Sequence, residues 1–362
     1  MNNPSGDVAS TSRRIVTLEQ FIVDTFTLIG EDGVERPVEQ PDQIGGGGTY
    51  AIIGARIFTP PSELGMIIDY TPATLTKAIR DDLKYYGSDM WAFRERTDGH
   101  PTARAVNRYQ GQSRGFEYLT KPLLLTPHSL SATPFADPLP STIHFISYPA
   151  PRAEIILSEV KELRDQKERN PIIVWEPEDE SLEVMQKIAK DIDVIGPNHN
   201  EVIRLFQPHI PPEVTPKELQ TIYAELCLRI AQFRPKIGVV IRCGCLGCCY
   251  AATPTTPHNQ DRRPDVKWVP AYWNPQREGW SEGKVVDPTG AGNAFMGGLA
   301  AAVDRGYLLD EAVIWGSVAA SFTIEQNGLP VLTTKEGKEL WNDEDPSDRV
   351  QIMKRDLGWN ES

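Results

Sequence analysis

A short run of small residues near the C-terminal end is the stretch of the sequence best suited to chemistry. In DPTGAGNAFMGG, Gly290, Ala291 and Gly292 lack large side chains and directly precede a predicted helix. Such a turn exposes successive backbone N–H groups at the positive end of a helix dipole, where a phosphate can bind. Gly297 and Gly298, one turn further on, leave the helix face bare for a close approach. The alternative is a glycine-rich helix N-cap that serves tight packing alone.

The elements that must position this turn alternate along the chain. Strands separated by helices of ten or more residues indicate parallel βαβ units with right-handed crossovers. The sequence therefore predicts an α/β fold with helices flanking a doubly wound, mainly parallel sheet. The predicted strands are STIHFISY, PIIVWEP, DVIGPN, IGVVIR and the VVD before the turn, and the predicted helices are AEIILSEVKELRDQKER, SLEVMQKIAKDI, EVIRLF and PKELQTIYAELCLRIAQF.

The first third of the chain is predicted to add a strand, a helix and a lid. RRIVTLEQFIVDTFTL is interpreted as a first strand that ends near Asp24, and the glycines of GGGGTYAIIGARIF open a helix. MIIDYT follows as a short buried strand, and the charged, aromatic text of residues 92–119 is typical of a small exposed β-lid. The Pro-rich segment 254–283 is interpreted as a long surface excursion.

Four candidate residues follow predicted strands. In open parallel sheets, ligands bind outside the carboxyl ends of the strands. We therefore expect Asp24, Asn198, Gly244 and Gly290 to converge on one site.

Composition limits the classes of partner. The chain has 362 residues with 40% hydrophobic and 24% charged residues, a net charge of -13 and a pI near 5.0. An acidic protein of this kind is not expected to bind nucleic acid or an anionic membrane. The N-terminal text holds no apolar run, so we expect a cytoplasmic protein. The predicted organisation is a disordered tail at 1–13, one domain at 14–340 with lid candidates at 25–44 and 92–120, and a C-terminal extension at 341–362.

The cysteines and histidines are less specific. Cys243, Cys245, Cys248 and Cys249 stand in RCGCLGCCY, where two short strands joined by a GCLG turn are expected. A cluster of reduced, buried thiols is the favoured interpretation, and a metal site is the alternative. The six histidines show no paired ligand spacing, although His199 lies beside other candidate residues.

Four motifs in sequence order resemble those of the PfkB/ribokinase family of carbohydrate kinases. The family's Asp-Thr-x-Gly-Ala-Gly-Asp motif is matched around the turn, with Pro288 inserted between the first two matching residues. The resemblance spans roughly Ile15 to Leu332, and TYA after the glycines together with Asn293 resembles a fungal branch that includes the maintenance-of-killer proteins. The matching residues are Asp287, Thr289, Gly290, Ala291 and Gly292 at the turn, Gly45 and Gly46 in the di-glycine motif, Asn198 and Glu201 in Asn-x-x-Glu, and Gly244 and Gly247 in Gly-x-x-Gly.

This resemblance implies an ATP-dependent kinase of sugars, nucleosides or related alcohols, with Mg²⁺ and a small β-lid. It implies a monomer or a homodimer paired through the lids, and a small-molecule alcohol as acceptor. The implied roles are an anion hole from Gly290, Ala291 and Gly292, Mg²⁺ held through water by Glu201 and Asn198, nucleotide contacts from Gly244, Gly247 and Thr289, and acceptor contacts from Asp24, Gly45, Gly46 and Tyr50.

Two positions depart from the family pattern. The family's proton-accepting aspartate is replaced by Asn293, whose amide is no base near neutral pH. General-base catalysis contributes about 10²–10⁴-fold, but phosphoryl transfer depends mostly on positioning and charge stabilisation. Asp287 is a possible substitute. Tyr50 replaces an asparagine, so either the acceptor pocket is remodelled or this tyrosine only packs on its helix.

The sequence therefore supports two main hypotheses. One is a kinase that works with Asn293, and the other is a nucleotide-binding pseudokinase with a regulatory or partner-binding role. A structural protein without nucleotide binding is a third and weaker alternative. The lid arginines either meet an anionic substrate or form solvated surface charge, which is the favoured interpretation; they are Arg94, Arg96, Arg104 and Arg108.

Overall fold

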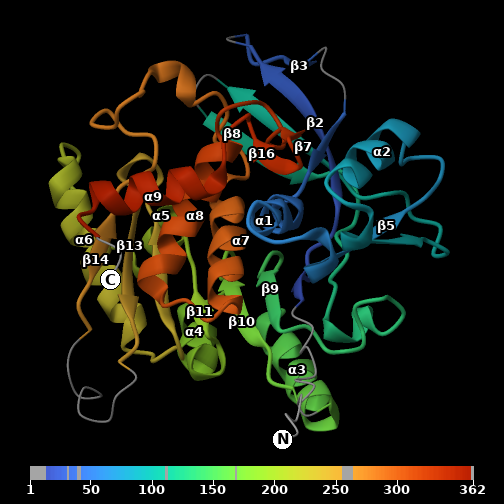
Figure 1. Cartoon of the computed structure of the whole chain (residues 1–362), viewed down its shortest axis with the longest axis horizontal. Coiled ribbons are helices and arrows are strands. Elements are labelled where there is room, and N and C mark those ends of the chain that lie inside the picture. Colours follow the sequence, from blue (N-terminus) through green and yellow to red (C-terminus); the bar gives the residue numbers. More distant parts are fainter. Residues whose placement is uncertain are drawn as a thin grey trace, which may run out of the picture.

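A nine-stranded sheet forms the centre of the molecule (Figure 1). The structure is a computed structural model that describes residues 14–30, 32–38, 42–110, 113–167, 169–254 and 264–359; the predicted tail at 1–13 lies outside them. All neighbouring strands are parallel except two pairs at one edge of the sheet, β12–β13 and β13–β14, which are antiparallel. In spatial order the strands are β14 (Lys267–Val269), β13 (Cys248–Ala252), β12 (Gly238–Arg242), β11 (Val194–Ile195), β10 (Ile172–Glu176), β9 (Thr142–Ile146), β1 (Ile15–Thr17), β5 (Leu64–Tyr70) and β6 (Trp91–Glu95).

Two layers of helices cover the two faces of this sheet. Successive strand residues point to opposite faces, and accordingly Ile173 and Val174 belong to different core clusters. One layer contains α1 (Gly47–Arg56), α2 (Lys77–Tyr85), α7 (Ala291–Asp304), α8 (Leu309–Thr323) and α9 (Pro346–Asp356), and the other contains α3 (Ala153–Lys167), α4 (Leu182–Ile188), α5 (His199–Phe206) and α6 (Pro216–Ala231). The predicted doubly wound α/β fold is confirmed.

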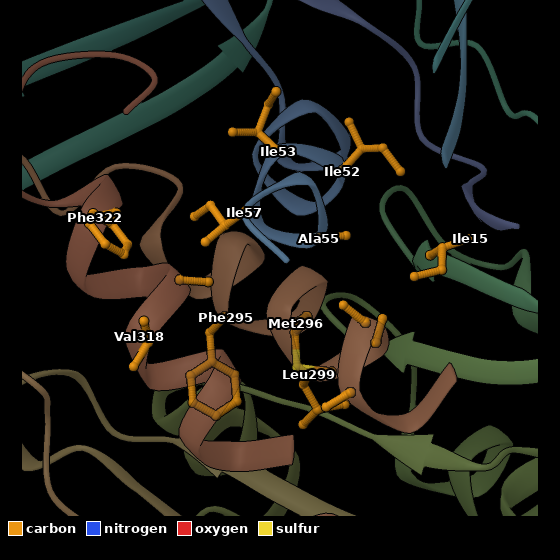
Figure 2. Close-up of a cluster of buried hydrophobic side chains, with 14 of the residues drawn as sticks. Ile15, Ile52, Ile53, Ala55, Ile57, Phe295, Met296, Leu299, Val318 and Phe322 are labelled. Carbon is orange, nitrogen blue, oxygen red and sulfur yellow. The ribbon is translucent and has the colours of Figure 1, made fainter. Parts of the chain in front are cut away.

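Helices α1, α7 and α8 pack closely because glycines replace side chains at their contacts. A Cβ on Gly297 would lie 1.7 Å from the carbonyl oxygen of Ala51, and one on Gly54 would lie 2.2 Å from that of Ala294. Figure 2 shows buried apolar side chains of these helices, among them Ile53 of α1 and Phe295 of α7. The bare helix face predicted at Gly297 therefore admits another helix of the same chain.

A smaller five-stranded sheet lies at one end of the molecule, at the top of Figure 1. Its strand β2 follows β1 closely in the chain, and its strand β4 leads into α1. The strands are β2 (Ile22–Ile29), β3 (Glu35–Pro37), β4 (Gln43–Gly45), β7 (Arg104–Gln110) and β8 (Ser113–Tyr118). Strand β6, most of which lies in the predicted lid segment 92–120, belongs to the large sheet instead. The division into kinase domain and lid stays a prediction.

The N-terminal apolar text forms two strands rather than one. β1 ends at Thr17 in the large sheet and β2 begins at Ile22 in the small sheet. Asp24 accordingly lies within β2, not at the end of a first strand. The intervening residues carry the chain across the carboxyl edge of the large sheet, which places Glu19 and Gln20 there.

The predicted strand before the glycine turn does not form. Val285 and Val286 are 40% and 50% exposed, and they follow a short 3₁₀ helix at Glu282–Lys284. The N–H groups of Val286 and Asp287 both donate to the carbonyl oxygen of Ile324, at 2.8 and 3.2 Å. The end of α8 thus takes the hydrogen bonds that a strand would need.

The predicted surface excursion at 254–283 is partly core. Its residues 264–283 lie in the described part of the chain, and β14 adds an antiparallel edge to the large sheet. Tyr272 and Trp273 are buried beside Arg349 of α9. Chain beyond residue 340 also forms the end of strand β16 (Lys338–Trp341), which pairs with β15 (Leu332–Lys335). Among the described residues, none of the helices is long and apolar enough to cross a membrane.

Candidate active site

A cavity of about 490 Å³ lies at the carboxyl end of the central strands. Its wall includes the last residues of β9, β10 and β12, the start of α7, and residues of the small sheet. Five carboxylates line it, and Arg242 is the single arginine or lysine among the described residues of its wall. The carboxylates are Glu19, Asp24, Glu176, Glu178 and Glu201.

The glycine turn forms one wall of this cavity. Gly290 has φ of 73° and precedes α7, and a Cβ there would lie 2.1 Å from the ring of Tyr50. A Cβ on Gly292 would lie 2.6 Å from Nη1 of Arg242. Gly290 requires glycine both for its backbone conformation and for space, whereas a Cβ on Gly292 would require the end of the Arg242 side chain to shift.

Several hydrogen-bond donors at this turn have no acceptor within the described part of the chain. The N–H groups of Ala291 and Ala294 donate to the carbonyl oxygens of Pro288 and Gly290, whereas those of Gly292 and Asn293 have no such acceptor. The first N–H groups of a helix need a partner from outside it. Thr289 Oγ1 and Arg242 Nε, both buried, also lack one. This donor set suits an anion.

Asn293 is held by a buried carboxylate on the neighbouring strand. Its Nδ2 donates to both oxygens of Glu176, at 3.1 and 3.0 Å. His144 Nε2 donates to Glu176 Oε1 at 2.8 Å, and Arg242 Nη1 lies 2.7 Å from Oε2. Burial alone would raise the pKa of Glu176, but Arg242 and His144 outweigh it and hold this pKa below its ordinary value.

The Asn198–Glu201 pair forms a capping box at the start of α5. Asn198 Oδ1 accepts from the N–H groups of Asn200 and Glu201, and Glu201 Oε2 accepts from the Asn198 N–H at 2.8 Å. Both residues line the cavity, and Arg242 Nη2 lies 3.9 Å from Glu201 Oε2. Burial raises the pKa of Glu201 despite this guanidinium. The motif thus has a complete role as a helix cap, and it also presents one carboxylate to the cavity.

The described residues contain no group of three or more side chains arranged to hold a metal ion. A site with one carboxylate suits Mg²⁺ only where water and substrate phosphates supply the remaining oxygens. Glu201 beside the donor set of the glycine turn meets that condition.

The residues predicted to face the acceptor lie on the opposite side of the turn. Asp24 packs against Gly45, where a Cβ would lie 2.0 Å from its carboxylate, and Gly46 has φ of 89° at the start of α1. Tyr50 is 4% exposed; its ring packs on Gly290 and it also lines the cavity. Both interpretations of this tyrosine therefore describe part of what it does.

Other predicted site residues lie away from the cavity wall. Gly244 and Gly247 form the β12–β13 turn, and a Cβ on Gly247 would lie 2.1 Å from the carbonyl oxygen of Val269. Asp287 accepts a hydrogen bond from the Thr289 N–H at 2.9 Å and stabilises the turn. Asp287 does not line the cavity, and its role as a substitute for the missing aspartate stays a prediction.

The lid arginines and the cysteines form contacts outside the cavity. Arg94 pairs with Asp69, Arg96 with Asp98, Arg104 with Asp42, and Arg108 with Glu35 and Glu117. Cys243, Cys248 and Cys249 are buried; hydrogen bonds between thiols together with burial raise the pKa values of Cys243 and Cys249, and burial raises that of Cys248. Such thiols behave as small apolar side chains.

Sequence reasoning missed the residues that surround Asn293. The spacing of the histidines gives no reason to choose His144, and none of the motifs contains Glu176 or Arg242. A signal was available, because Glu176 ends the predicted strand PIIVWEP and Arg242 ends IGVVIR, and parallel strand ends meet at one edge of a sheet.

Comparison with known proteins agrees with this fold. The family model described as pfkB family carbohydrate kinase matches residues 273–334. An uncharacterized protein of Schizosaccharomyces pombe is 32% identical over 369 residues, covering 97% of this chain and 94% of that protein. Protein MAK32 of Saccharomyces cerevisiae is 28% identical over 348 residues, covering 90% and 88%.

Solved structures of ribokinases share the fold at low sequence identity. The Giardia lamblia ribokinase superposes with a TM-score of 0.66 at 15% identity, covering 88% of this chain and 96% of that chain. The Cryptococcus neoformans ribokinase in complex with ADP gives a TM-score of 0.63 at 17% identity, with the same coverage. The chain therefore belongs to the PfkB/ribokinase family of carbohydrate kinases, in the fungal branch that includes MAK32.

Proposed function

We propose that this protein transfers a phosphoryl group from ATP to a hydroxyl group of a small molecule, such as a sugar, a nucleoside or a related alcohol. The observation that carries the proposal is the set of unpartnered donors at the glycine turn: the N–H groups of Gly292 and Asn293, Thr289 Oγ1 and Arg242 Nε. The two side-chain donors are buried, and buried donors without acceptors are costly unless a ligand satisfies them. A terminal phosphate has the charge and the oxygens to do so.

The residues around the turn would have different roles in phosphoryl transfer. The N–H groups of Gly292 and Asn293 and the guanidinium of Arg242 would stabilise negative charge on the transferring group. Glu201 would hold Mg²⁺ through water, and the metal would neutralise charge on the nucleotide phosphates. The solved ribokinase with ADP supports a nucleotide as the phosphate source.

The acceptor would enter beside the small sheet. Gln20, Asp24, Phe116, Tyr118 and Tyr148 line this part of the cavity. Tyr118 and Tyr148 are stacked with ring centroids 5.9 Å apart, and Phe116 meets Tyr118 edge-to-face at 5.1 Å. Polar and aromatic side chains together suit a ligand with hydroxyl groups and a flat or apolar face.

A specific observation favours the alternative, a nucleotide-binding pseudokinase with a regulatory or partner-binding role. Arg242 is ion-paired with Glu176 directly against Gly292, and Asn293 is no base. If the guanidinium stays there, a nucleotide could bind without being positioned for transfer.

Release of ADP from ATP–Mg²⁺ across a panel of sugars, nucleosides and other alcohols tests the proposal. We expect turnover that depends on one acceptor class and is lost in Gly292→Val, because the added side chain fills the turn beside Arg242. Gly283→Ala is the matched control, since its Cβ would have ordinary 3.8 Å contact with Ser281. Nucleotide binding without turnover for any acceptor would favour the pseudokinase.

A further inference from the structure

We propose that Glu176 supplies the carboxylate that position 293 lacks, and that Arg242 covers this carboxylate until a phosphate group binds at the glycine turn. The inference depends on the proposed phosphoryl transfer. The acceptor hydroxyl would give its proton to Glu176 Oε2 while its oxygen bonds to the transferred phosphorus. The bond from that phosphorus to the ADP oxygen breaks, and the Glu176 carboxyl later releases its proton to solvent.

The first argument is the direct contact between the two side chains. Asn293 Nδ2 is 3.1 and 3.0 Å from the two oxygens of Glu176, and both residues line the cavity. The amide nitrogen must face the carboxylate, because the amide oxygen would repel it. An aspartate at 293 would instead put two carboxylates about 3 Å apart, where they cannot both ionise freely. Asn293 and Glu176 thus form a compensating pair. Position 293 carries no charge, and the negative charge lies instead on Glu176, on the neighbouring strand.

The second argument is that the carboxylate is held rigidly on one side. His144 Nε2 must donate to Glu176 Oε1, because a carboxylate only accepts, and Thr17 Oγ1 lies 3.0 Å from the other ring nitrogen. His144 is 2% exposed on β9, and it therefore fixes the orientation of the glutamate. Positioning of this kind is needed for a residue that must meet a substrate proton.

The third argument is that, of the three donors to Glu176, Arg242 is the one that lies against the glycine turn, where a ligand would meet it. Glu176 Oε1 contacts His144 and Asn293, and Oε2 contacts Asn293 and Arg242, so all lone-pair directions are in use. Arg242 has a long side chain, its Nε has no partner, and its Nη1 lies against Gly292. A phosphate at the turn would meet this guanidinium directly, and arginine pairs with phosphate oxygens with two parallel hydrogen bonds.

The two contacts of Arg242 couple phosphate binding to the uncovering of the base. As the guanidinium turns toward phosphate, Oε2 of Glu176 becomes available to the acceptor hydroxyl. Arg242 is the largest influence that lowers the pKa of Glu176, so its departure also raises the basicity of this carboxylate. His144, Glu201, Glu178 and Glu19 also face the Glu176 region and keep their positions in this scheme.

A charge-exchange experiment tests the role of Glu176. Glu176→Gln should lower acceptor-dependent turnover by about 10²–10⁴-fold with little change in nucleotide affinity. Asn293→Asp in the Glu176→Gln background should recover at least about tenfold of that loss, because it returns a carboxylate to the contact. Glu183→Gln, an exposed change on α4, is the matched control and should leave turnover unaltered.

The outcomes separate this inference from the proposed function. The role of Glu176 alone would be overturned if Glu176→Gln kept turnover within a few-fold of the native protein. It would also be overturned if Glu176→Gln, Asn293→Asp were no faster than Glu176→Gln. Loss of turnover in Glu178→Gln but not in Glu176→Gln would overturn it in favour of the other cavity glutamate. Nucleotide binding without native turnover would overturn both proposals.

Binding of inorganic phosphate, measured by the rise in Tm, tests Arg242 without any need for turnover. We expect Arg242→Gln to weaken phosphate binding by about ten- to a hundredfold, and Arg242→Lys to restore only part of it. The double variant Arg242→Gln, Glu176→Gln keeps the local charge balanced, so it serves if the single variant misfolds. Phosphate affinity equal to that of the native protein in these variants would overturn the covering role of Arg242.

Discussion

At the scale of single residues, the cavity concentrates more negative charge than its one arginine balances. Glu19 is paired with Arg152 at 2.8 Å and Glu176 with Arg242 at 2.7 Å, but no cation of the described residues forms such a pair with Glu178. Its carboxyl reaches solvent inside the cavity, yet surrounding protein raises its pKa to about 7, with Glu201 and Glu176 contributing further. The Glu178 carboxyl therefore titrates near neutral pH.

The raised pKa of Glu178 predicts that this residue makes a pH-dependent contribution to the free energy of unfolding. The folded protein holds the Glu178 proton more tightly than the unfolded chain, so its contribution to the free energy of unfolding falls as pH rises from about 4.5 through 7. In Glu178→Gln that fall is absent. We expect the Tm of the variant to equal that of the native protein near pH 4.5, to exceed it increasingly up to about pH 7, and to keep a constant difference above that pH. A Tm difference independent of pH over this range would contradict the assignment.

Single residues were only partly predictable from the sequence. The glycines of the turn and the loss of the aspartate at 293 are local signals, and both are visible in DPTGAGN. The partner of Asn293 is not local, because Glu176 lies 117 positions away and reaches it only through the order of strands in the sheet. A motif indicates which residue types are present, whereas the sheet decides which of them meet.

At the scale of elements, close helix packing supports the turn. The contact of α1 with α7 fixes both Tyr50 and the start of α7 relative to each other. That contact depends on Gly297, since a Cβ would meet backbone atoms of Ala51 and Ala55 at 1.7–2.9 Å. Backbone atoms in two packed helices cannot move away as the end of a side chain can.

We therefore expect Gly297→Ala to destabilise the protein by about 3 kcal/mol or more, at the upper end of the cost of overpacking. Urea unfolding followed by circular dichroism measures this free energy. Gly115→Ala in β8 is the matched control, because its Cβ would lie 3.8 Å from Arg108 in ordinary contact. Equal stability of the two variants would show that α1 and α7 separate at low cost.

Elements with strong periodicity were predicted well, and elements defined by tertiary hydrogen bonds were not. The helices at Ala153–Lys167 and Pro216–Ala231 and the strands on both sides of the GCLG turn are confirmed. VVD is apolar enough for a strand, but the N–H groups of Val286 and Asp287 donate to the carbonyl oxygen of Ile324 instead of to a neighbouring strand. The break between β1 and β2 carries no glycine or proline, and it arises because the two strands join different sheets.

At the scale of the whole molecule, the C-terminal segment completes the core. Trp341 is 1% exposed and α9 packs on α8, while the predicted division into a domain at 14–340 and an extension at 341–362 stays a prediction. Tyr272 and Trp273, from the Pro-rich segment, lie against the same helix. Composition suggested exposure for the Pro-rich segment, but both segments supply large side chains to the core.

Arg349 of α9 joins these segments, and it gives a prediction for the molecule as a whole. Its fully buried guanidinium lies 2.7 Å from Glu325 and 2.8 Å from Glu344, and 3.7 Å from the centre of the Phe322 ring. Removing one partner of a buried ion pair leaves the other charge uncompensated, at a cost of about 3–5 kcal/mol. Arg349→Ala should therefore lower the free energy of unfolding by this amount, as measured in urea.

The matched control is Arg355→Ala on the same helix, whose side chain is 70% exposed and whose loss should change stability by less than about 1 kcal/mol. Adding Glu325→Gln to Arg349→Ala should recover part of the loss, because the buried charge is then removed together with its partner. If α9 were an appended helix, Arg349→Ala would release it without lowering the main unfolding transition. A single cooperative transition shifted to lower urea would instead mean that chain from residue 14 to residue 359 folds as one unit.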